Sequence, residues 1–232
     1  QLNSDADAVE NDFNQDGVSD LAFRNDSTGQ NIIWLINNAQ KLSGGQVGSV
    51  NPNHSFKAFG DFDGDGDQDI LFRNDSKGEN VIWLIENGQK LSGGIVGSVN
   101  AKHYFEAVGD FDNDGDDDIL FRNQATGQNV IWLIQNGEML SGGMVGSHNI
   151  NHGFKAVGDF DNDGDDDLLF RNDITGQNNI WLIENGQKLS GGMVGGQNAS
   201  YGFTAVGDFD NDGDADLLFR NNSNGQNVIW LI

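Results

Sequence analysis

The chain has 232 residues, with 12 basic and 36 acidic side chains and a formal net charge of −24. A charge of this sign argues against nucleic acid and anionic membrane surfaces as partners. The sequence has no cysteine, so no disulfide can cross-link the fold, although bound metal can do this in its place. It also has no run of 18 apolar residues, and we therefore expect no insertion into a membrane.

An internal repeat of 49 residues organises the sequence. Tryptophan and arginine both recur at this spacing, and the five arginines are the only ones in the chain: Trp34, Trp83, Trp132, Trp181 and Trp230, with Arg24, Arg73, Arg122, Arg171 and Arg220. Repeats of about 40–50 residues are typical of propellers, in which each unit forms one blade.

The unit from Phe105 to Phe154 shows what each repeat is expected to form. Runs of small, β-branched and aromatic residues predict four short strands, at residues 105–109, 119–123, 129–134 and 138–146. The third and fourth strands are joined by Asn136-Gly137, a strong hairpin signal. No segment has a sustained apolar period of 3.6 residues, so we expect almost no helix. The second and third strands read as continuous apolar runs rather than as a clean alternation, which indicates that both of their faces are covered.

These features predict an all-β fold: a single β-propeller domain over residues 1–232, with five blades of about 49 residues. Each blade has four antiparallel strands, except the last, whose pattern stops after its third strand. The first unit is imperfect, with Val9-Glu10-Asn11 where later copies have Ala-Val-Gly or Ala-Phe-Gly. A solenoid is the alternative architecture. The sequence leaves open whether the five blades close into a ring by face packing alone or belong to a larger ring.

An acidic loop follows the first strand of every unit. In Asp110–Asp118 acidic residues occupy positions 1, 3, 5 and 9, and Gly115 at position 6 permits a sharp bend. The five copies span residues 12–20, 61–69, 110–118, 159–167 and 208–216. Such spacing directs several oxygen atoms inward, as a hard cation requires. An EF-hand would need glutamate at position 12, where each copy has phenylalanine. A solvated acidic turn without metal is the alternative, but five copies disfavour it because crowded carboxylates repel one another.

The segment Val108–Leu120 and its four counterparts resemble the FG-GAP/VCBS repeat family, the calcium-loop propeller repeats also seen in integrin α heads. The resemblance implies about five structural calcium ions per chain. Each ion would be held by the side chains at positions 1, 3, 5 and 9 and by the backbone carbonyl at position 7, and would join the first strand of a blade to the second. The ligands implied in the five loops are Asp12, Asn14, Asp16, Val18 and Asp20; Asp61, Asp63, Asp65, Asp67 and Asp69; Asp110, Asp112, Asp114, Asp116 and Asp118; Asp159, Asp161, Asp163, Asp165 and Asp167; and Asp208, Asp210, Asp212, Asp214 and Asp216.

The repeated arginines and tryptophans each have two interpretations. An arginine at the end of the second strand could bind an acidic sugar, but pairing with an aspartate between blades is the more common role. A tryptophan in the third strand could stack on a sugar, but its apolar surroundings favour packing in the core.

A polar set recurs in the connection between blades, three residues apart in each copy. Its members are Asn51 and His54, Asn100 and His103, Asn149 and His152, and Asn198 and Tyr201. In a propeller this connection lies on the face opposite the acidic loops, beside the turns between the second and third strands. Repeated polar and aromatic groups on one rim suit a repeating ligand such as a glycan. The alternative is that copying a blade copies its connections without any function.

The sequence therefore predicts a secreted, calcium-stabilised, lectin-like propeller with several equivalent carbohydrate sites, whose partners are glycans or glycoconjugates. The alternative is a non-catalytic adhesion or scaffold module of a larger secreted protein. A polysaccharide lyase or hydrolase comes third, because no Gly-x-Ser-x-Gly, His-Glu-x-x-His or phosphate loop is present. We expect no catalytic residues. The oligomeric state is left open.

Overall fold

The computed structural model describes residues 11–232. This range contains 18 β-strands and no helix, so the prediction of an all-β fold is confirmed. Consequently residues 11–232 include no helix with the length and apolar character needed to span a membrane. The strand position at the start of the first unit includes Val9 and Glu10, which lie outside the described residues.

Five antiparallel sheets follow one another along the chain, and we call them blades 1 to 5. In the described residues blade 1 has three strands, β1 (Leu21–Asn25), β2 (Gln30–Asn37) and β3 (Gln40–Ser49). Blade 2 has four strands: β4 (Ser55–Gly60), β5 (Asp69–Asn74), β6 (Glu79–Glu86) and β7 (Gln89–Ser98). Blades 3 and 4 also have four each: β8 (Tyr104–Gly109), β9 (Asp118–Arg122), β10 (Gln128–Gln135) and β11 (Glu138–Ser147), then β12 (Gly153–Gly158), β13 (Asp167–Arg171), β14 (Gln177–Glu184) and β15 (Gln187–Gly196). Blade 5 has three, as predicted: β16 (Tyr201–Gly207), β17 (Asp216–Asn221) and β18 (Asn227–Trp230).

Each blade is a meander in which every strand pairs with the next one along the chain. In blades 2 to 4 an Asn-Gly pair forms a tight hairpin between the third and fourth strands, as predicted. Asn136 and Gly137 both have positive φ, at 52° and 74°. That geometry matches the primed turns that favour Asn-Gly in two-residue hairpins.

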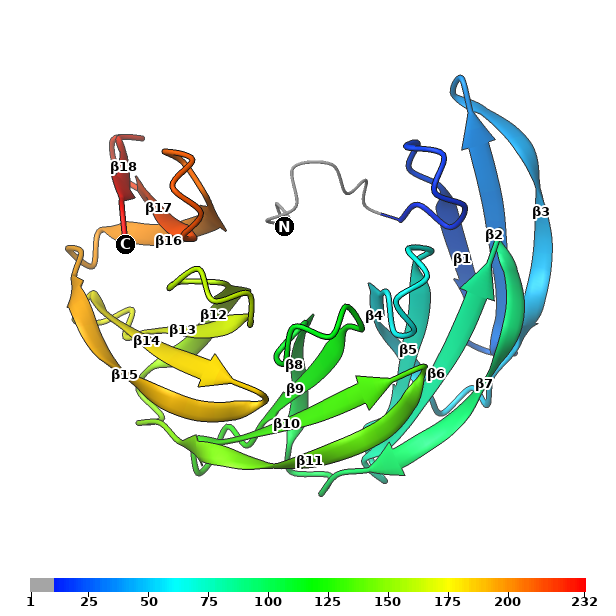
Figure 1. The fold of residues 1–232 in the computed structure, drawn as a ribbon, viewed down its shortest axis with the longest axis horizontal. Helices are drawn as coiled ribbons and strands as arrows, with labels where there is room; N and C mark the ends of the chain where they lie inside the picture. Colours follow the sequence, from blue (N-terminus) through cyan, green and yellow to red (C-terminus); the bar gives the residue numbers. More distant parts are fainter. Residues whose placement is uncertain (1–10) are drawn as a thin grey trace.

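The blades lie side by side along an open arc (Figure 1). The first strands of the blades, such as β8 and β12, lie toward the inside of the arc, and the long fourth strands β7, β11 and β15 lie along the outside. The predicted four-stranded blades are thus present, but the described chain leaves an opening between blade 1 and blade 5 (Figure 1). Residues 11–232 therefore do not form a closed ring.

The core lies between neighbouring blades rather than inside any one of them. One apolar cluster joins blade 2 and blade 3, and it includes Phe62, Leu71, Ile82, Ile119, Phe121, Trp132 and Ile134. Every residue of the second strands β5, β9 and β13 is buried. Both faces of these strands are covered, which explains the uninterrupted apolar run inside each of them, such as Ile119-Leu120-Phe121 in β9.

The end blades expose residues that the central blades bury. Leu21 and Trp34 of blade 1 are 47% and 36% exposed. Their counterparts in blade 2, Ile70 and Trp83, are each 3% exposed. Trp83 packs against blade 1 at Gly48, where a β-carbon would lie only 3.0 Å from the tryptophan ring. The core-packing interpretation of the tryptophans is therefore confirmed for the central blades.

The central arginines are structural. Arg73, Arg122 and Arg171 are almost fully buried. Arg122 donates to the carbonyl of Gly127, to Asn129 Oδ1 and to the carbonyl of His152. Its guanidinium lies 5.0 Å from the ring centroid of Phe170 in the next blade. The contact that crosses between blades is thus to an aromatic ring, and the aspartate that pairs with Arg73, Asp75, belongs to its own blade.

Candidate metal centre

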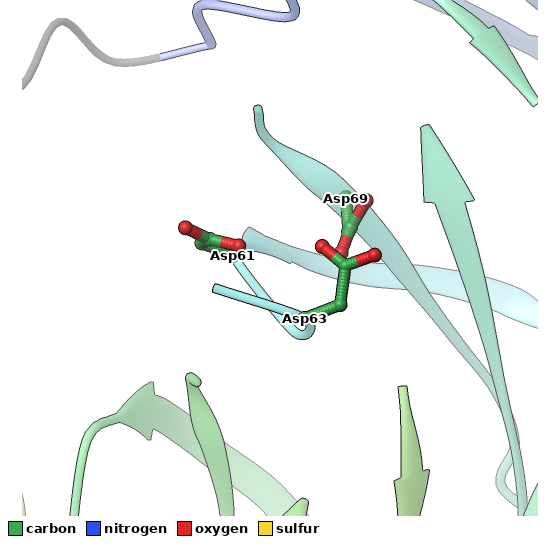
Figure 2. A group of neighbouring side chains, drawn as sticks. All are labelled: Asp61, Asp63 and Asp69. Atoms are coloured by element: carbon green, nitrogen blue, oxygen red, sulfur yellow. The ribbon is translucent and has the colours of Figure 1, made fainter. Parts of the chain in front are cut away.

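In blades 2 to 5 an acidic loop connects the first and second strands, and in blade 1 the loop directly precedes β1. In blade 2 the side chains of Asp61, Asp63 and Asp69 point toward one another (Figure 2). One carboxylate oxygen from each of the three lies within 4.8 Å of the other two. Three further loops bring together the same positions 1, 3 and 9: Asp110, Asp112 and Asp118; Asp159, Asp161 and Asp167; and Asp208, Asp210 and Asp216. The loop in blade 1 carries Asp12, Asn14 and Asp20 at these positions.

The aspartate at position 1 accepts hydrogen bonds from the backbone of its own loop. Asp61 Oδ1 accepts the backbone N–H of Asp65 at 3.2 Å, and Asp61 Oδ2 accepts that of Gly66 at 2.8 Å. Gly66 has a φ of 89°, in the left-handed region that favours glycine. The glycine at position 6 therefore lets the chain fold back over the carboxylate of position 1, so this part of the loop is organised by its own hydrogen bonds.

Position 9 joins the loop to the third strand of the blade. Asp118 is fully buried, and its Oδ2 accepts the N–H of Phe111 while its Oδ1 accepts the N–H of Ile134. Burial, with repulsion from Asp112 and Asp110, raises the pKa of Asp118 to about 9. Burial likewise raises the pKa values of Asp69 and Asp167 to about 8. Placing ionised carboxylates this close together is costly without a cation.

Position 3 supplies an oxygen atom that has no hydrogen-bond partner. Asp63 Oδ1, Asp112 Oδ1 and Asn14 Oδ1 are each buried and receive no donor. Burial and the neighbouring aspartates raise the pKa values of Asp63 and Asp112 to about 6. A buried, unpaired oxygen beside two further carboxylates fits a hard cation, and an all-oxygen donor set suits calcium. The residues present therefore fit the ion that the sequence implied.

Positions 5 and 7 are used differently from positions 1, 3 and 9. The carboxylates of position 5 lie outside the three-residue groups, and Asp65 Oδ1 accepts the N–H of Asp67 at 2.8 Å. At position 7 the side chain turns away to the hairpin, where Asp116 Oδ2 accepts the N–H of Asn136 at 2.6 Å. Asp67 and Asp165 make the same bond. Sequence reasoning assigned only the carbonyl of position 7 and missed this role, although the recurrence of aspartate there in four loops was a signal.

Calcium binding is expected to release protons near neutral pH. In blades 2, 3 and 4 the carboxyls at position 9, Asp69, Asp118 and Asp167, have folded-state pKa values of about 8 to 9, above the ordinary value of 3.8. At pH values between the ordinary and the raised pKa, the calcium-free folded chain binds more protons than the unfolded chain. The stability of the calcium-free fold therefore falls as the pH rises through this range. Calcium requires the ionised form and displaces those protons. Calorimetric titration at about pH 6.5, in buffers of different ionisation enthalpy, should show buffer-dependent heats that fade toward about pH 9. Identical heats in all buffers at the lower pH would contradict this assignment.

The predicted rim set lies at the opposite end of the strands. The connection between blades meets the turn between second and third strands, as where the N–H of His148 donates to the carbonyl of Gly127. The hairpin at the other end meets an acidic loop, since the N–H of Gly137 donates to the carbonyl of Phe62. The structure thus places Asn51, His54, Asn100, His103, Asn149, His152, Asn198 and Tyr201 on the side away from the acidic loops.

Members of the rim set make local contacts. Asn100 Oδ1 accepts the N–H of Lys102, and the other three asparagines make the same turn-stabilising bond. His54 Nε2 lies 2.8 Å from Glu79 Oε1. Tyr201 donates its hydroxyl hydrogen to Gln226 Oε1 at 3.1 Å. In blades 2 and 5, His54 and Tyr201 therefore each contact an acidic or amide residue of their own blade.

A comparison with protein families decides what these repeats are. The profile described as FG-GAP-like repeat matches residues 12–72, 61–121 and 159–228. The chain belongs to the FG-GAP-like repeat family. Each matched segment includes an acidic loop, which is the feature that carried the resemblance in the sequence. A search of curated proteins found no match.

Two solved structures with TM-scores of at least 0.50 are similar to this FG-GAP-like chain. The β-propeller domain of Cps50 (Swd1) from Myceliophteria thermophila has a TM-score of 0.50 and 12% identity, and covers 88% of this chain. A prolyl endopeptidase has a TM-score of 0.52 and 12% identity, and covers 91% of this chain. The chain spans 66% and 32% of the lengths of these two proteins. At such identity the likeness shows the fold alone.

Proposed function

We propose that this FG-GAP-like chain is a secreted, calcium-stabilised propeller module without catalytic activity, and that it binds carbohydrate at repeated sites on the rim opposite its acidic loops. The calcium part is carried by one observation. Asp63 and Asp112 each hold a buried Oδ1 without a hydrogen-bond partner beside two further carboxylates. Extracellular calcium is abundant enough to fill sites of modest affinity, which supports a secreted setting.

The repeated side-chain pairs on the rim support carbohydrate binding. His54 with Glu79, and Tyr201 with Gln226, are the same two positions in blades 2 and 5. Blades 3 and 4 carry histidine and glutamine at these positions, and Gln177 is exposed. Imidazole, phenol and amide groups can donate to and accept from sugar hydroxyls. Equivalent sites on one rigid arc would gain avidity on a surface that displays many copies of one sugar.

Removal of two rim histidines is expected to weaken glycan binding. A glycan array probed in calcium should identify ligands, and the affinity of a hit should then fall roughly fivefold in a His103→Ala, His152→Ala double variant, since a lost hydrogen bond is worth about 1 kcal/mol. The backbone carbonyls that accept from the buried arginines remain, so calcium-dependent melting should be unchanged. Lys102→Ala is the matched control, because this exposed residue of the same connection lies outside the repeated set. Equal affinities in all three proteins would contradict the assignment of the site.

A scaffold or adhesion module is the second candidate, and a specific observation favours it. The rim asparagines stabilise their own turns, and His54 and His152 are only 5% and 9% exposed. Little of these side chains is then left for a ligand. Absence of any hit on a broad glycan array would therefore favour the scaffold. Turnover of a polysaccharide by the purified chain would instead favour a lyase or hydrolase and contradict the proposal of a non-catalytic module.

A further inference from the structure

Neighbouring acidic loops are hydrogen-bonded to one another. The N–H of position 8 in each loop donates to the carbonyl of position 1 in the loop of the preceding blade. This bond occurs at all four junctions: Gln68 to Asp12, Asp117 to Asp61, Asp166 to Asp110, and Ala215 to Asp159. Position 1 is one of the three carboxylates grouped in each loop. The backbone of one candidate calcium loop therefore contacts a candidate ligand of the loop before it.

Two junctions have an additional bond from a side chain. Asp117 Oδ2 accepts the backbone N–H of Asp61 at 2.8 Å, across the junction of blades 2 and 3. Asp166 Oδ2 accepts the N–H of Asp110 at 3.1 Å, across the junction of blades 3 and 4. Each of these aspartates therefore makes two hydrogen bonds to one residue of the preceding loop. Its backbone N–H donates to the carbonyl of that residue, and its carboxylate accepts the N–H of the same residue. We call Asp117 and Asp166 the tie residues.

Glycines in the preceding blades make room for the tie residues. A β-carbon at Gly60 would lie 2.8 Å from Asp117 Oδ2, and one at Gly109 would lie 2.5 Å from Asp166 Oδ2. Both separations are too short for a real side chain. The glycine that ends each first strand therefore permits the close approach of the carboxylate from the next blade.

The outer junctions lack this carboxylate. Position 8 is Gln68 at the junction of blades 1 and 2 and Ala215 at the junction of blades 4 and 5. Amides bridge these loops from position 4 instead: Gln15 donates to the carbonyl of Asp65, and Asn162 donates to that of Asp212 at 3.5 Å. The chain thus contains two junctions with the tie and two without it, on the same scaffold.

We propose that the tie residues couple the calcium sites of blades 2, 3 and 4, so that an ion in one loop raises the affinity of the neighbouring loop for calcium. This inference rests on the calcium part of the proposed function. A cation held by Asp118, and by the carbonyl of Asp116 as the family resemblance implies, would fix the residue between them, Asp117. Asp117 in turn fixes Asp61, a ligand of the neighbouring site. The second ion then binds a loop that is already ordered, which is positive cooperativity without a new contact to metal.

Calcium titration calorimetry on the full chain and a set of variants tests this coupling. Asp112→Ala removes the site of blade 3, and the sites of blades 2 and 4 should then bind calcium at least about fivefold more weakly. In an Asp117→Ala, Asp166→Ala background, the same removal should leave the remaining affinities unchanged. Alanine at position 8 is already accommodated in the fifth loop as Ala215, so these variants keep a residue that the loop tolerates.

The outer junction supplies the matched control. Asp210→Ala removes the site of blade 5, and the site of blade 4 should be unaffected because Ala215 provides no carboxylate. Ala215→Asp should introduce the missing carboxylate. In that background, Asp210→Ala should lower the calcium affinity of the site in blade 4. Equal effects of Asp112→Ala with and without the tie residues would overturn the coupling. A chain that binds five ions independently would refute only the coupling, whereas a chain that binds none would refute the calcium assignment itself.

Discussion

Removal of calcium is expected to lower the melting temperature of this chain by roughly 20 °C or more. An ion held at about 100 times its dissociation constant adds about 2.7 kcal/mol, and each kcal/mol shifts the melting temperature of a chain of this size by about 2–4 °C. Five filled loops would therefore have an effect of several tens of degrees. The cause is repulsion among aspartates such as Asp61, Asp63 and Asp69, which no described lysine or arginine neutralises by an ion pair.

Differential scanning calorimetry with calcium, and then with a chelator, measures this effect. Magnesium is the matched control, and it should restore little of the loss because it demands a tighter octahedral site and gives up water reluctantly. Superimposable melting curves with calcium and with the chelator would show that the loops are acidic turns without a structural ion.

Substitution of the buried arginine Arg122 by alanine is expected to destabilise the fold by about 3 kcal/mol or more. The change leaves the carbonyl of His152 and Oδ1 of Asn129 without their donor, and each buried, unpaired group costs about 1–3 kcal/mol. It also removes the contact with Phe170 across the junction of blades 3 and 4. Urea unfolding, monitored by tryptophan fluorescence in calcium, measures the loss.

Arg220 is the matched control within the same chain. It occupies the same repeat position in blade 5, but it is exposed and its guanidinium donates to Asn227 at 3.2 Å. Arg220→Ala should therefore cost less than about 1 kcal/mol, as exposed substitutions usually do. A similar loss for Arg122→Ala and Arg220→Ala would mean that burial between blades does not determine the contribution of these arginines.

The repeat made most of the fold predictable. A 49-residue period that carries one tryptophan, one arginine and one acidic loop per unit leaves few architectures to consider. The second strands β5, β9 and β13 each contain an uninterrupted apolar run because both of their faces are covered, and that run is visible in the sequence. Positions 1, 3 and 9 of the loops were likewise predictable, since alternate residues in a tight turn point the same way.

The contacts between blades could not be predicted in the same way. Asp117 reaches Asp61, 56 residues earlier in the chain, and nothing in its local sequence distinguishes it from Asp116, which instead accepts from Asn136. The aromatic partner of Arg122 also depends on which face of the next blade is presented. Such contacts follow from how one repeat stacks on the next. The opening of the arc is a property of the same stacking, which the strand pattern of a single unit does not encode.

A crystal structure of the chain grown in millimolar calcium would test directly whether the acidic loops hold calcium. We expect five ions per chain, one in each acidic loop, with oxygen ligands from positions 1, 3 and 9 at about 2.3–2.6 Å. In blade 3 these ligands are Asp110, Asp112 and Asp118, with the formerly unpaired Oδ1 of Asp112 facing the ion. Loops that keep the same conformation and hold no ion at that calcium concentration would contradict the assignment of these loops as calcium sites.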